Sequence, residues 1–251
     1  MLQTEGLTVR FGGHVAVDGV SCTFAPGTLT AIVGPNGAGK TTYFNLISGQ
    51  IRASAGRVRL NGQDLTGLGA AERTRAGLGR AFQLTQLFPR LTVLENVRLA
   101  VQACAGEGLN LWQIWSDRRE LLVRAREIVA AVALADKQHV PAAALPHGDQ
   151  RKLEVAILMA LQPQVFMFDE PTAGMSVDDV PVILNLIRAL KADKTKTILL
   201  VEHKMDVVRE LADRIIVLHN GQLVADGEPE AVIASPVVQR AYLGQDVEVA
   251  A

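Results

Sequence analysis

A glycine-rich segment near the N-terminus constrains this chain more than any other feature. Residues 34–42 read GPNGAGKTT and match the phosphate-binding loop pattern G-x-x-x-x-G-K-[ST] at every fixed position. The segment follows the apolar run 29–33 and precedes the run 43–48, which Gly49 ends. A strand, a loop and a helix in this order place backbone N–H groups and a positive helix end around one anion. The sequence therefore predicts a nucleotide-binding loop.

The loop offers specific contacts for a magnesium-bound triphosphate. Lys40 is expected to reach the β- and γ-phosphates, and the Thr41 hydroxyl is expected to ligate Mg²⁺. An ordinary glycine-rich turn is the alternative interpretation, and the flanking strand and helix argue against it. The residues expected to contact the nucleotide are Gly34, Pro35, Asn36, Gly37, Ala38, Gly39, Lys40, Thr41 and Thr42.

Composition limits the classes of partner. The chain has 251 residues and a net charge of −1 without blocks of Lys or Arg, which argues against nucleic acid as a main partner. Cys22 and Cys104 have no metal-ligand spacing and are expected to be buried thiols. No apolar run reaches the ~18 residues of a membrane-spanning helix, and the N-terminus does not resemble a signal peptide. We expect a cytoplasmic protein.

The N-terminal third has the pattern of an antiparallel sheet. Residues 1–33 alternate between apolar and polar, and residues 56–63 form a hairpin pattern around an Asn-Gly turn. Phe11 stands beside Gly12-Gly13, where packing in the sheet and stacking on an adenine are both open interpretations.

The remaining chain alternates between helical and strand patterns. Thr92 and Glu95 match a capping box, and Val93, Val97 and Val101 share one helical face. The other predicted elements are helices over about 117–135, from about 149, and over about 176–191, strands at 165–168 and 197–201, a hairpin around 220–221, and a short C-terminal helix. Ser176 is the expected cap of the helix that runs to about 191.

Three apolar strands end in polar, chemically capable residues. Val33 leads into the phosphate loop, Phe168 into Asp169 and Glu170, and Val201 into Glu202-His203. In an open parallel sheet, ligands bind at the carboxyl ends of the strands. We therefore expect these groups to meet around one phosphate chain. Asp169 would hold Mg²⁺, Glu170 would polarise the attacking water, and His203 would contact the γ-phosphate.

Taken together, these motifs resemble the ATPases of ATP-binding cassette (ABC) transporters over nearly the whole chain. The segments that carry the resemblance are the phosphate loop, 82–83, 145–150, 168–171, 173–176 and 202–203. The resemblance implies an α/β fold, a P-loop NTPase (RecA-like) core with an antiparallel β subdomain and an inserted helical subdomain. It implies one ABC ATPase domain over 1–251, with the helical subdomain at about 84–160 and a C-terminal tail at about 228–251.

The resemblance also assigns roles to individual residues. Gln83 is similar to the Q-loop glutamine, which joins Mg²⁺ to the surface that meets the permease, and Phe11 to the aromatic residue that stacks on adenine. Residues 145–150 resemble the signature motif, in which Gly148 and Asp149 would face the ATP of a partner subunit. His203 resembles the switch histidine. The implied cofactors are ATP and Mg²⁺, bound between two cassettes in a head-to-tail dimer.

Finer features narrow the resemblance to the branched-chain amino acid uptake group. They are the segments 10–13, 87–97, 151–156 and 240–244. Such importers resemble an assembly of two ATPases, two integral membrane permeases and a periplasmic binding protein. The ATPase is peripheral on the cytoplasmic face of the inner membrane, and the solute never touches it. Related ATPases that serve urea or amide import or lipopolysaccharide export remain alternatives, and a non-transport ABC ATPase is less favoured.

One residue departs from the pattern of the family. The second position of the signature motif is normally serine, and here it is Pro146, which has neither hydroxyl nor N–H. We hypothesise that the ATP site completed by this signature is the weaker of two in a heterodimer. The alternative is that the proline only preorganises the turn at the helix entrance.

Overall fold

The computed structural model describes residues 1–81, 87–106 and 119–243, which belong to two compact units. The first unit comprises residues 1–80, 164–170 and those from 191 onwards, and the second comprises 81–163 and 171–190. The sequence analysis placed a helical subdomain at about 84–160 and a C-terminal tail at about 228–251, and these bounds stay predictions.

The secondary-structure elements follow the expected order. The strands are β1 (Leu2–Phe11), β2 (His14–Phe24), β3 (Leu29–Val33), β4 (Ala55–Leu60), β5 (Gln63–Asp64), β6 (Leu78–Ala81), β7 (Val165–Asp169), β8 (Thr197–Val201), β9 (Arg214–His219) and β10 (Gln222–Gly227). The α-helices are α1 (Lys40–Ser48), α2 (Ala70–Arg75), α3 (Val93–Cys104), α4 (Arg119–Ala131), α5 (His147–Leu161), α6 (Val180–Ala192), α7 (Met205–Leu211), α8 (Pro229–Ile233) and α9 (Pro236–Leu243). Two short 3₁₀ turns, η2 (Ala135–Lys137) and η3 (Ala142–Ala144), precede α5.

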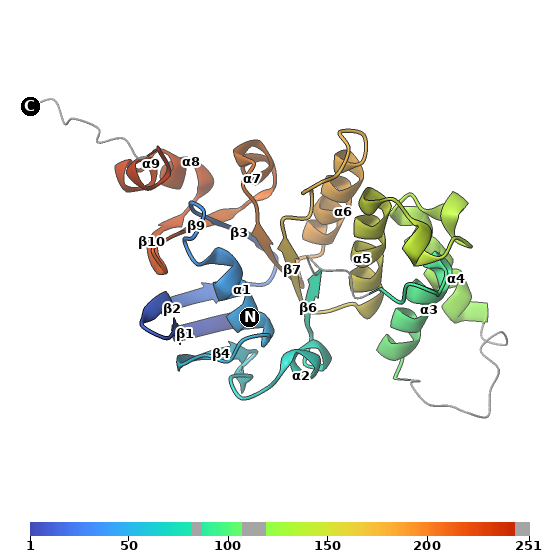
Figure 1. Cartoon of the computed structure of the whole chain (residues 1–251), viewed down its shortest axis with the longest axis horizontal. Coiled ribbons are helices and arrows are strands. Elements are labelled where there is room, and N and C mark those ends of the chain that lie inside the picture. Colours follow the sequence, from blue (N-terminus) through green and yellow to red (C-terminus); the bar gives the residue numbers. More distant parts are fainter. Residues whose placement is uncertain (82–86, 107–118, 244–251) are drawn as a thin grey trace, which may run out of the picture. The chain divides into compact units, whose positions relative to one another are not determined.

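A six-stranded sheet with the order β10-β9-β3-β8-β7-β6 lies at the centre of the first unit (Figure 1). Strands β9, β3, β8 and β7 pair in parallel. Ile32 of β3 and Asp169 of β7 both lie opposite Val201 of β8. The three strands predicted to end in functional residues are therefore neighbours, in a register that brings their carboxyl ends to one edge.

A second sheet, with the order β2-β1-β4-β5, is antiparallel throughout, as its alternating pattern predicts. The predicted Asn-Gly turns are present at Asn61-Gly62 and Asn220-Gly221, with φ of 51° and 83° in the first and 48° and 78° in the second. Positive φ at both central residues is the type I′ geometry, whose twist matches that of the paired strands. The Asn-Gly pair at each turn therefore explains why a hairpin forms there.

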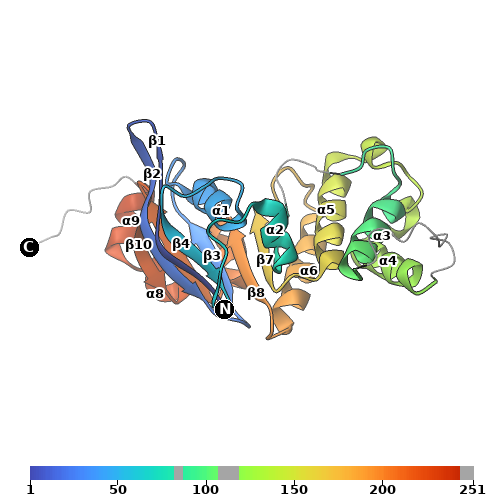
Figure 2. The same ribbon diagram turned by 90° about the horizontal axis from the view of Figure 1, so that it is seen from below.

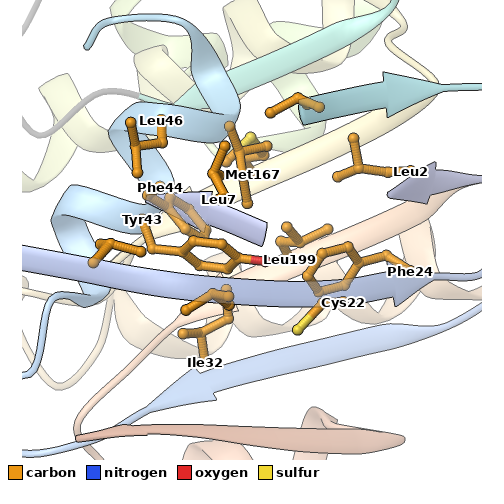
Figure 3. Close-up of a cluster of buried hydrophobic side chains, with 14 of the residues drawn as sticks. Leu2, Leu7, Cys22, Phe24, Ile32, Tyr43, Phe44, Leu46, Met167 and Leu199 are labelled. Atoms are coloured by element: carbon orange, nitrogen blue, oxygen red, sulfur yellow. The ribbon is translucent and has the colours of Figure 1, made fainter. Parts of the chain in front are cut away.

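The main core lies between α1, the antiparallel strands and one face of the parallel sheet (Figure 3). Tyr43 and Phe44 of α1 are fully buried in it. The Tyr43 hydroxyl lies 2.7 Å from the Thr4 hydroxyl, which also accepts a hydrogen bond of 3.0 Å from the Cys22 N–H. This pair satisfies two buried polar groups and joins the helix that follows the phosphate loop to the antiparallel sheet.

The opposite face of β3 and β9 is covered by the C-terminal helices α7, α8 and α9 (Figures 1 and 2). The apolar residues of this core are Ala31, Val33, Val208, Ile215, Val217, Val232 and Val238. The chain ends in two helices where one was predicted. Pro236, which has no N–H to continue α8, opens α9 instead.

Arg73 satisfies the carboxyl end of α1. Its buried guanidinium donates to the carbonyls of Leu46 and Ile47, both at 2.7 Å, and to those of Thr66 and Leu68 at 3.1 and 3.0 Å. The last carbonyls of a helix lack intrahelical partners and carry its negative end, so a cation there is stabilising. Among the described residues, the hydrogen-bond partners of this arginine are backbone carbonyls.

The second unit contains the predicted α3 with its capping box. The Thr92 N–H donates to the Glu95 carboxylate at 2.8 Å, and the Glu95 N–H donates to the Thr92 hydroxyl at 3.2 Å. The Thr92 N–H and the Thr92 hydroxyl, which both donate to the Glu95 carboxylate at 2.8 Å, lower the pKa of Glu95 below its ordinary value. Val93, Val97 and Val101 are buried along one face, which confirms the predicted helical period.

Two further expectations were wrong. Helix α6 begins at Val180, four residues after Ser176, because the Ser176 hydroxyl bonds Asp179 within a turn that precedes the helix. Cys104 is exposed while Cys22 is buried, since Cys104 is the last residue of α3. Within the described ranges, no helix is long and apolar enough to cross a membrane.

We predict that Tyr43→Phe destabilises the chain without changing its fold. The substitution keeps the buried ring and removes a hydroxyl, so the Thr4 hydroxyl loses a partner in the core. The free energy of unfolding should fall by about 1 kcal/mol. Urea denaturation followed by circular dichroism would measure it. An unchanged midpoint would show that this hydroxyl pair contributes nothing to stability.

Candidate functional site

The phosphate loop runs from the end of β3 to the start of α1 and is held open by glycines. Gly39, the N-cap of α1, has φ of 95°, and a Cβ there would lie 2.5 Å from the Ala16 carbonyl oxygen. Gly34 has φ of 152°, and a Cβ there would meet the Leu218 carbonyl oxygen. Gly39 has no side chain that could cap the first N–H groups of α1. The loop therefore keeps these donors available for an anion.

Lys40 lies across this loop. It is 6% exposed, and its Nζ donates to the carbonyls of Gly34 at 2.6 Å and Pro35 at 2.9 Å. Burial lowers the pKa of Lys40 below its ordinary value, while the negative charges of Glu170 and Asp169 act in the opposite direction. The ammonium group is thus positioned by backbone carbonyls inside the loop and lies in the field of both strand-tip carboxylates.

Asp169, the last residue of β7, forms a buried ion pair with Arg80 of β6. Arg80 Nη2 donates to Asp169 Oδ2 at 2.7 Å, and the two side chains are 5% and 0% exposed. Arg80 Nη1 also donates to Asn45 Oδ1 at 2.6 Å and to Ser48 Oγ at 3.0 Å, both on α1. Sequence reasoning missed Arg80, because nothing local in the sequence links it to a residue 89 positions away.

Glu170 and His203 lie together at adjacent strand ends. Glu170 Oε1 is 2.6 Å from His203 Nε2, and the Glu170 N–H donates to the Val201 carbonyl at 2.9 Å. Glu170 has φ of 49°, in the left-handed region that costs a non-glycine residue energy. A strained backbone here turns the carboxylate from the strand axis toward the neighbouring strand end. The structure thus brings together two residues that the sequence analysis paired.

An open pocket of about 270 Å³ collects these groups. Its lining residues are His14, Ala16, Asn36, Gly37, Ala38, Gly39, Lys40, Thr41, Thr42, Glu170 and His203. Most of the predicted nucleotide contacts therefore share one cavity with Glu170, the expected base, and His203, the expected switch histidine. A larger hollow of about 590 Å³ lies in the helical unit, and it contains none of the predicted site residues.

Phe11 and His14 stand at the end of the β1–β2 hairpin. They are paired across the Gly12-Gly13 turn, and Phe11 is 50% exposed. Phe11 is therefore outside the core, although its stacking on adenine stays a prediction. His14 lines the pocket, and the sequence analysis did not single it out. In a hairpin that turns at Gly12-Gly13, His14 is paired with Phe11, and this pairing could have pointed to His14 from the sequence.

The signature segment begins α5 in the second unit. Pro146 is the N-cap and makes no side-chain cap hydrogen bond, and the helix starts at His147. Asp149 is buried and pairs with Lys137 at 2.5 Å and with Lys152 at 3.2 Å. Its carboxylate is thus held by lysines of its own unit, and its contact with a partner's nucleotide stays a prediction.

Lys152 joins the signature segment to the residues before α6. Its Nζ pairs with Asp179 as well as with Asp149. A Cβ at Gly148 would lie 3.1 Å from Asp179 Oδ2, so the two segments approach closely at this glycine. Burial acts to lower the pKa of Lys152, but the hydrogen bonds with Asp179 and Asp149 outweigh it and leave the pKa raised. The acidic partner Asp179 has a lowered pKa, mainly through Lys152.

The oxygen-bearing side chains at this site suit a Mg²⁺ ion that is bound mainly by the phosphates of a nucleotide. Over residues 1–81, 87–106 and 119–243, no group of three or more His, Cys, Asp or Glu side chains could hold a metal ion alone. Mg²⁺ is commonly bound by one or two protein oxygens together with substrate phosphates. Thr41 and Asp169 offer such oxygens beside the loop. Gln83, the third expected ligand, lies outside the described residues.

Comparisons with known proteins agree with this geometry. A family model described as "ABC transporter" matches residues 17–173. The chain is 39% identical over 250 residues to LivG of Escherichia coli (strain K12), a high-affinity branched-chain amino acid transport ATP-binding protein, with 98% of each chain covered.

Solved structures show the same architecture. A nucleotide-free ATP-binding cassette from an ABC transporter has a TM-score of 0.82 and 31% identity, over 98% of this chain and 99% of that one. A dimeric bacterial ABC transporter cassette has a TM-score of 0.79 and 25% identity, over 91% and 99%. Since the family model spans more than half of the sequence and the similarity to LivG extends over nearly all of it, the chain belongs to the ABC transporter family, as one of its ATP-hydrolysing nucleotide-binding subunits.

Proposed function

We propose that this chain binds and hydrolyses ATP to drive an importer of branched-chain amino acids. The observation that carries the proposal is the pocket that gathers Lys40, Glu170 and His203 beside the phosphate loop. The solute class follows from the 39% identity to LivG over 98% of both chains. The solute itself would bind elsewhere in the assembly, because the groups in this pocket suit phosphate.

The proposed mechanism assigns each step to a residue of the pocket. The amides of the phosphate loop and the Lys40 ammonium bind the β- and γ-phosphates. Thr41, Asp169 and Gln83 would hold Mg²⁺, which when bound neutralises phosphate charge. Glu170 orients and polarises the attacking water, and His203, 2.6 Å away, holds the Glu170 carboxylate and contacts the γ-phosphate. Phe11 stacks on the adenine.

The catalytic unit would be a head-to-tail dimer. The dimeric cassette to which this chain is similar supports that assembly. In it, Gly148 and the amino end of α5 would face the γ-phosphate held by the partner cassette. The dimer would lie on the cytoplasmic face of the inner membrane against integral permeases, with a periplasmic binding protein delivering the solute. ATP-driven closing and reopening would then move the permeases between access states.

Glu170→Gln should abolish turnover and preserve nucleotide binding. The substitution keeps the size and the hydrogen-bonding reach of the side chain but removes its basicity. We expect hydrolysis to fall by about 10²–10⁴-fold while the Kd for Mg-ATP changes little. Phosphate release and fluorescent-nucleotide titration would measure the two. Glu228→Gln, at an exposed carboxylate in the same unit, is the control, and normal hydrolysis in Glu170→Gln would show that the base is wrong.

Pro146→Ser tests whether one ATP site is weak. If the missing hydroxyl limits that site, restoring it should raise hydrolysis by the assembled complex, since one hydrogen bond to a charged phosphate contributes about 1.5–3 kcal/mol. Pro146→Ala, which removes the proline without supplying a hydroxyl, is the matched control. Equal rates in all three proteins would eliminate the asymmetry between the two sites.

The importer assignment is tested in the assembled complex. The chain, a second cassette, two permeases and a periplasmic binding protein would be reconstituted in vesicles. Leucine, isoleucine or valine with the binding protein should stimulate ATP hydrolysis and enter the vesicles. Stimulation by urea or a short amide instead, or vectorial movement of lipopolysaccharide, would contradict the assignment and identify the related transporter class.

A further inference from the structure

We propose that Arg80 is a built-in counter-charge and positioning residue for Asp169, and that it sets how strongly triphosphate binding depends on Mg²⁺. The inference rests on the proposed function, because it concerns the same nucleotide site. Asp169 stands at the end of β7, next to Glu170, which lines the nucleotide pocket. The residue that holds its carboxylate therefore influences the charge that an incoming nucleotide meets.

The guanidinium of Arg80 is fixed from three sides. Nη2 donates to Asp169 Oδ2 at 2.7 Å, Nη1 donates to Asn45 Oδ1 and Ser48 Oγ at 2.6 and 3.0 Å, and Cζ lies 5.4 Å from the centroid of the Phe44 ring. The last three groups all belong to α1, the helix that begins at the phosphate loop. The fork of the arginine thus ties the strand-tip carboxylate to the helix that follows the loop.

Stability alone gives little reason for this pair. Both side chains are almost fully buried, and taking two charges out of water costs free energy that their mutual attraction barely offsets. A well-packed apolar pair would often be as stable. A buried cation at a strand-tip carboxylate has a clear electrostatic consequence, however, when the ligand of the neighbouring pocket is highly charged.

That consequence has a definite sign. Without Arg80, the negative charge of Asp169 would be left without this counter-charge close to the phosphates. Metal-free ATP is more negative than Mg-ATP, so it would be repelled more strongly. Loss of the cation should therefore weaken binding of metal-free ATP more than binding of Mg-ATP. The ratio of the two dissociation constants, Kd in EDTA over Kd in Mg²⁺, should rise.

The experiment measures this ratio in the full-length chain with a fluorescent ATP analogue, at one fixed pH and ionic strength. Arg80→Met removes the charge and keeps an unbranched chain of similar length. We expect its ratio to exceed that of the unsubstituted chain by about tenfold. Arg80→Lys retains the charge and should stay within about twofold of the unsubstituted chain.

The matched control is Arg73→Met. Arg73 is also buried and also contacts the end of α1, but its hydrogen bonds go to the carbonyls of Leu46, Ile47, Thr66 and Leu68. A purely structural role of Arg80 would move the two variants alike. We expect Arg73→Met to lower the melting temperature and to leave the ratio within about twofold. If Arg80→Met does not fold, the ratio is measured in Arg80→Gln, which also removes the positive charge but keeps a polar side chain.

The results separate this inference from the function on which it rests. If the unsubstituted chain retains no nucleotide in Mg²⁺, the proposed function fails. If it binds Mg-ATP but the ratio in Arg80→Met and Arg80→Gln is unchanged or lowered, or rises equally in Arg73→Met, the role of Arg80 is overturned. A rise confined to the neutral variants of Arg80 supports it.

Discussion

The parallel pairing of β3, β8 and β7 is the constraint on which the site depends. Because parallel strands run in one direction, their carboxyl ends lie at one edge, and the residues that follow them are held a few ångströms apart. Ile32 and Asp169 share Val201 as a partner, so the phosphate loop, the Asp169-Glu170 pair and His203 leave the sheet from neighbouring positions. The close approach of loops that are distant in sequence is therefore a consequence of backbone hydrogen bonding.

At the edge of the sheet, each of two carboxylates is paired with a nitrogen-bearing side chain. Two carboxylates, Asp169 and Glu170, are adjacent in the chain, and each has its own partner, Arg80 for the first and His203 for the second. Lys40 lies within the field of both while its ammonium is held by loop carbonyls. The charged groups at this edge are thus held by partners on the protein.

The helical unit has an electrostatic organisation of its own. Lys152 of α5 joins Asp149 of the signature segment to Asp179, which precedes α6. The signature segment and the residues just before α6 are thereby tied within one unit, with Gly148 allowing their close approach. The amino end of α5 itself remains without a side-chain cap, since Pro146 has none to offer.

The sequence by itself determined the features that depend on neighbouring residues. The glycine spacing of the phosphate loop, the capping box at Thr92 and the two Asn-Gly turns are local signals, and apolar runs identified β3, β7 and β8. Only the tertiary structure decided which distant side chains meet. The Arg80–Asp169 pair, the presence of His14 in the pocket and the lysines around Asp149 join residues whose contact depends on sheet order and helix packing. Likewise the exposure of Cys104 and the late start of α6 were set by how each element ends, because a short-range pattern carries no information about what packs against it.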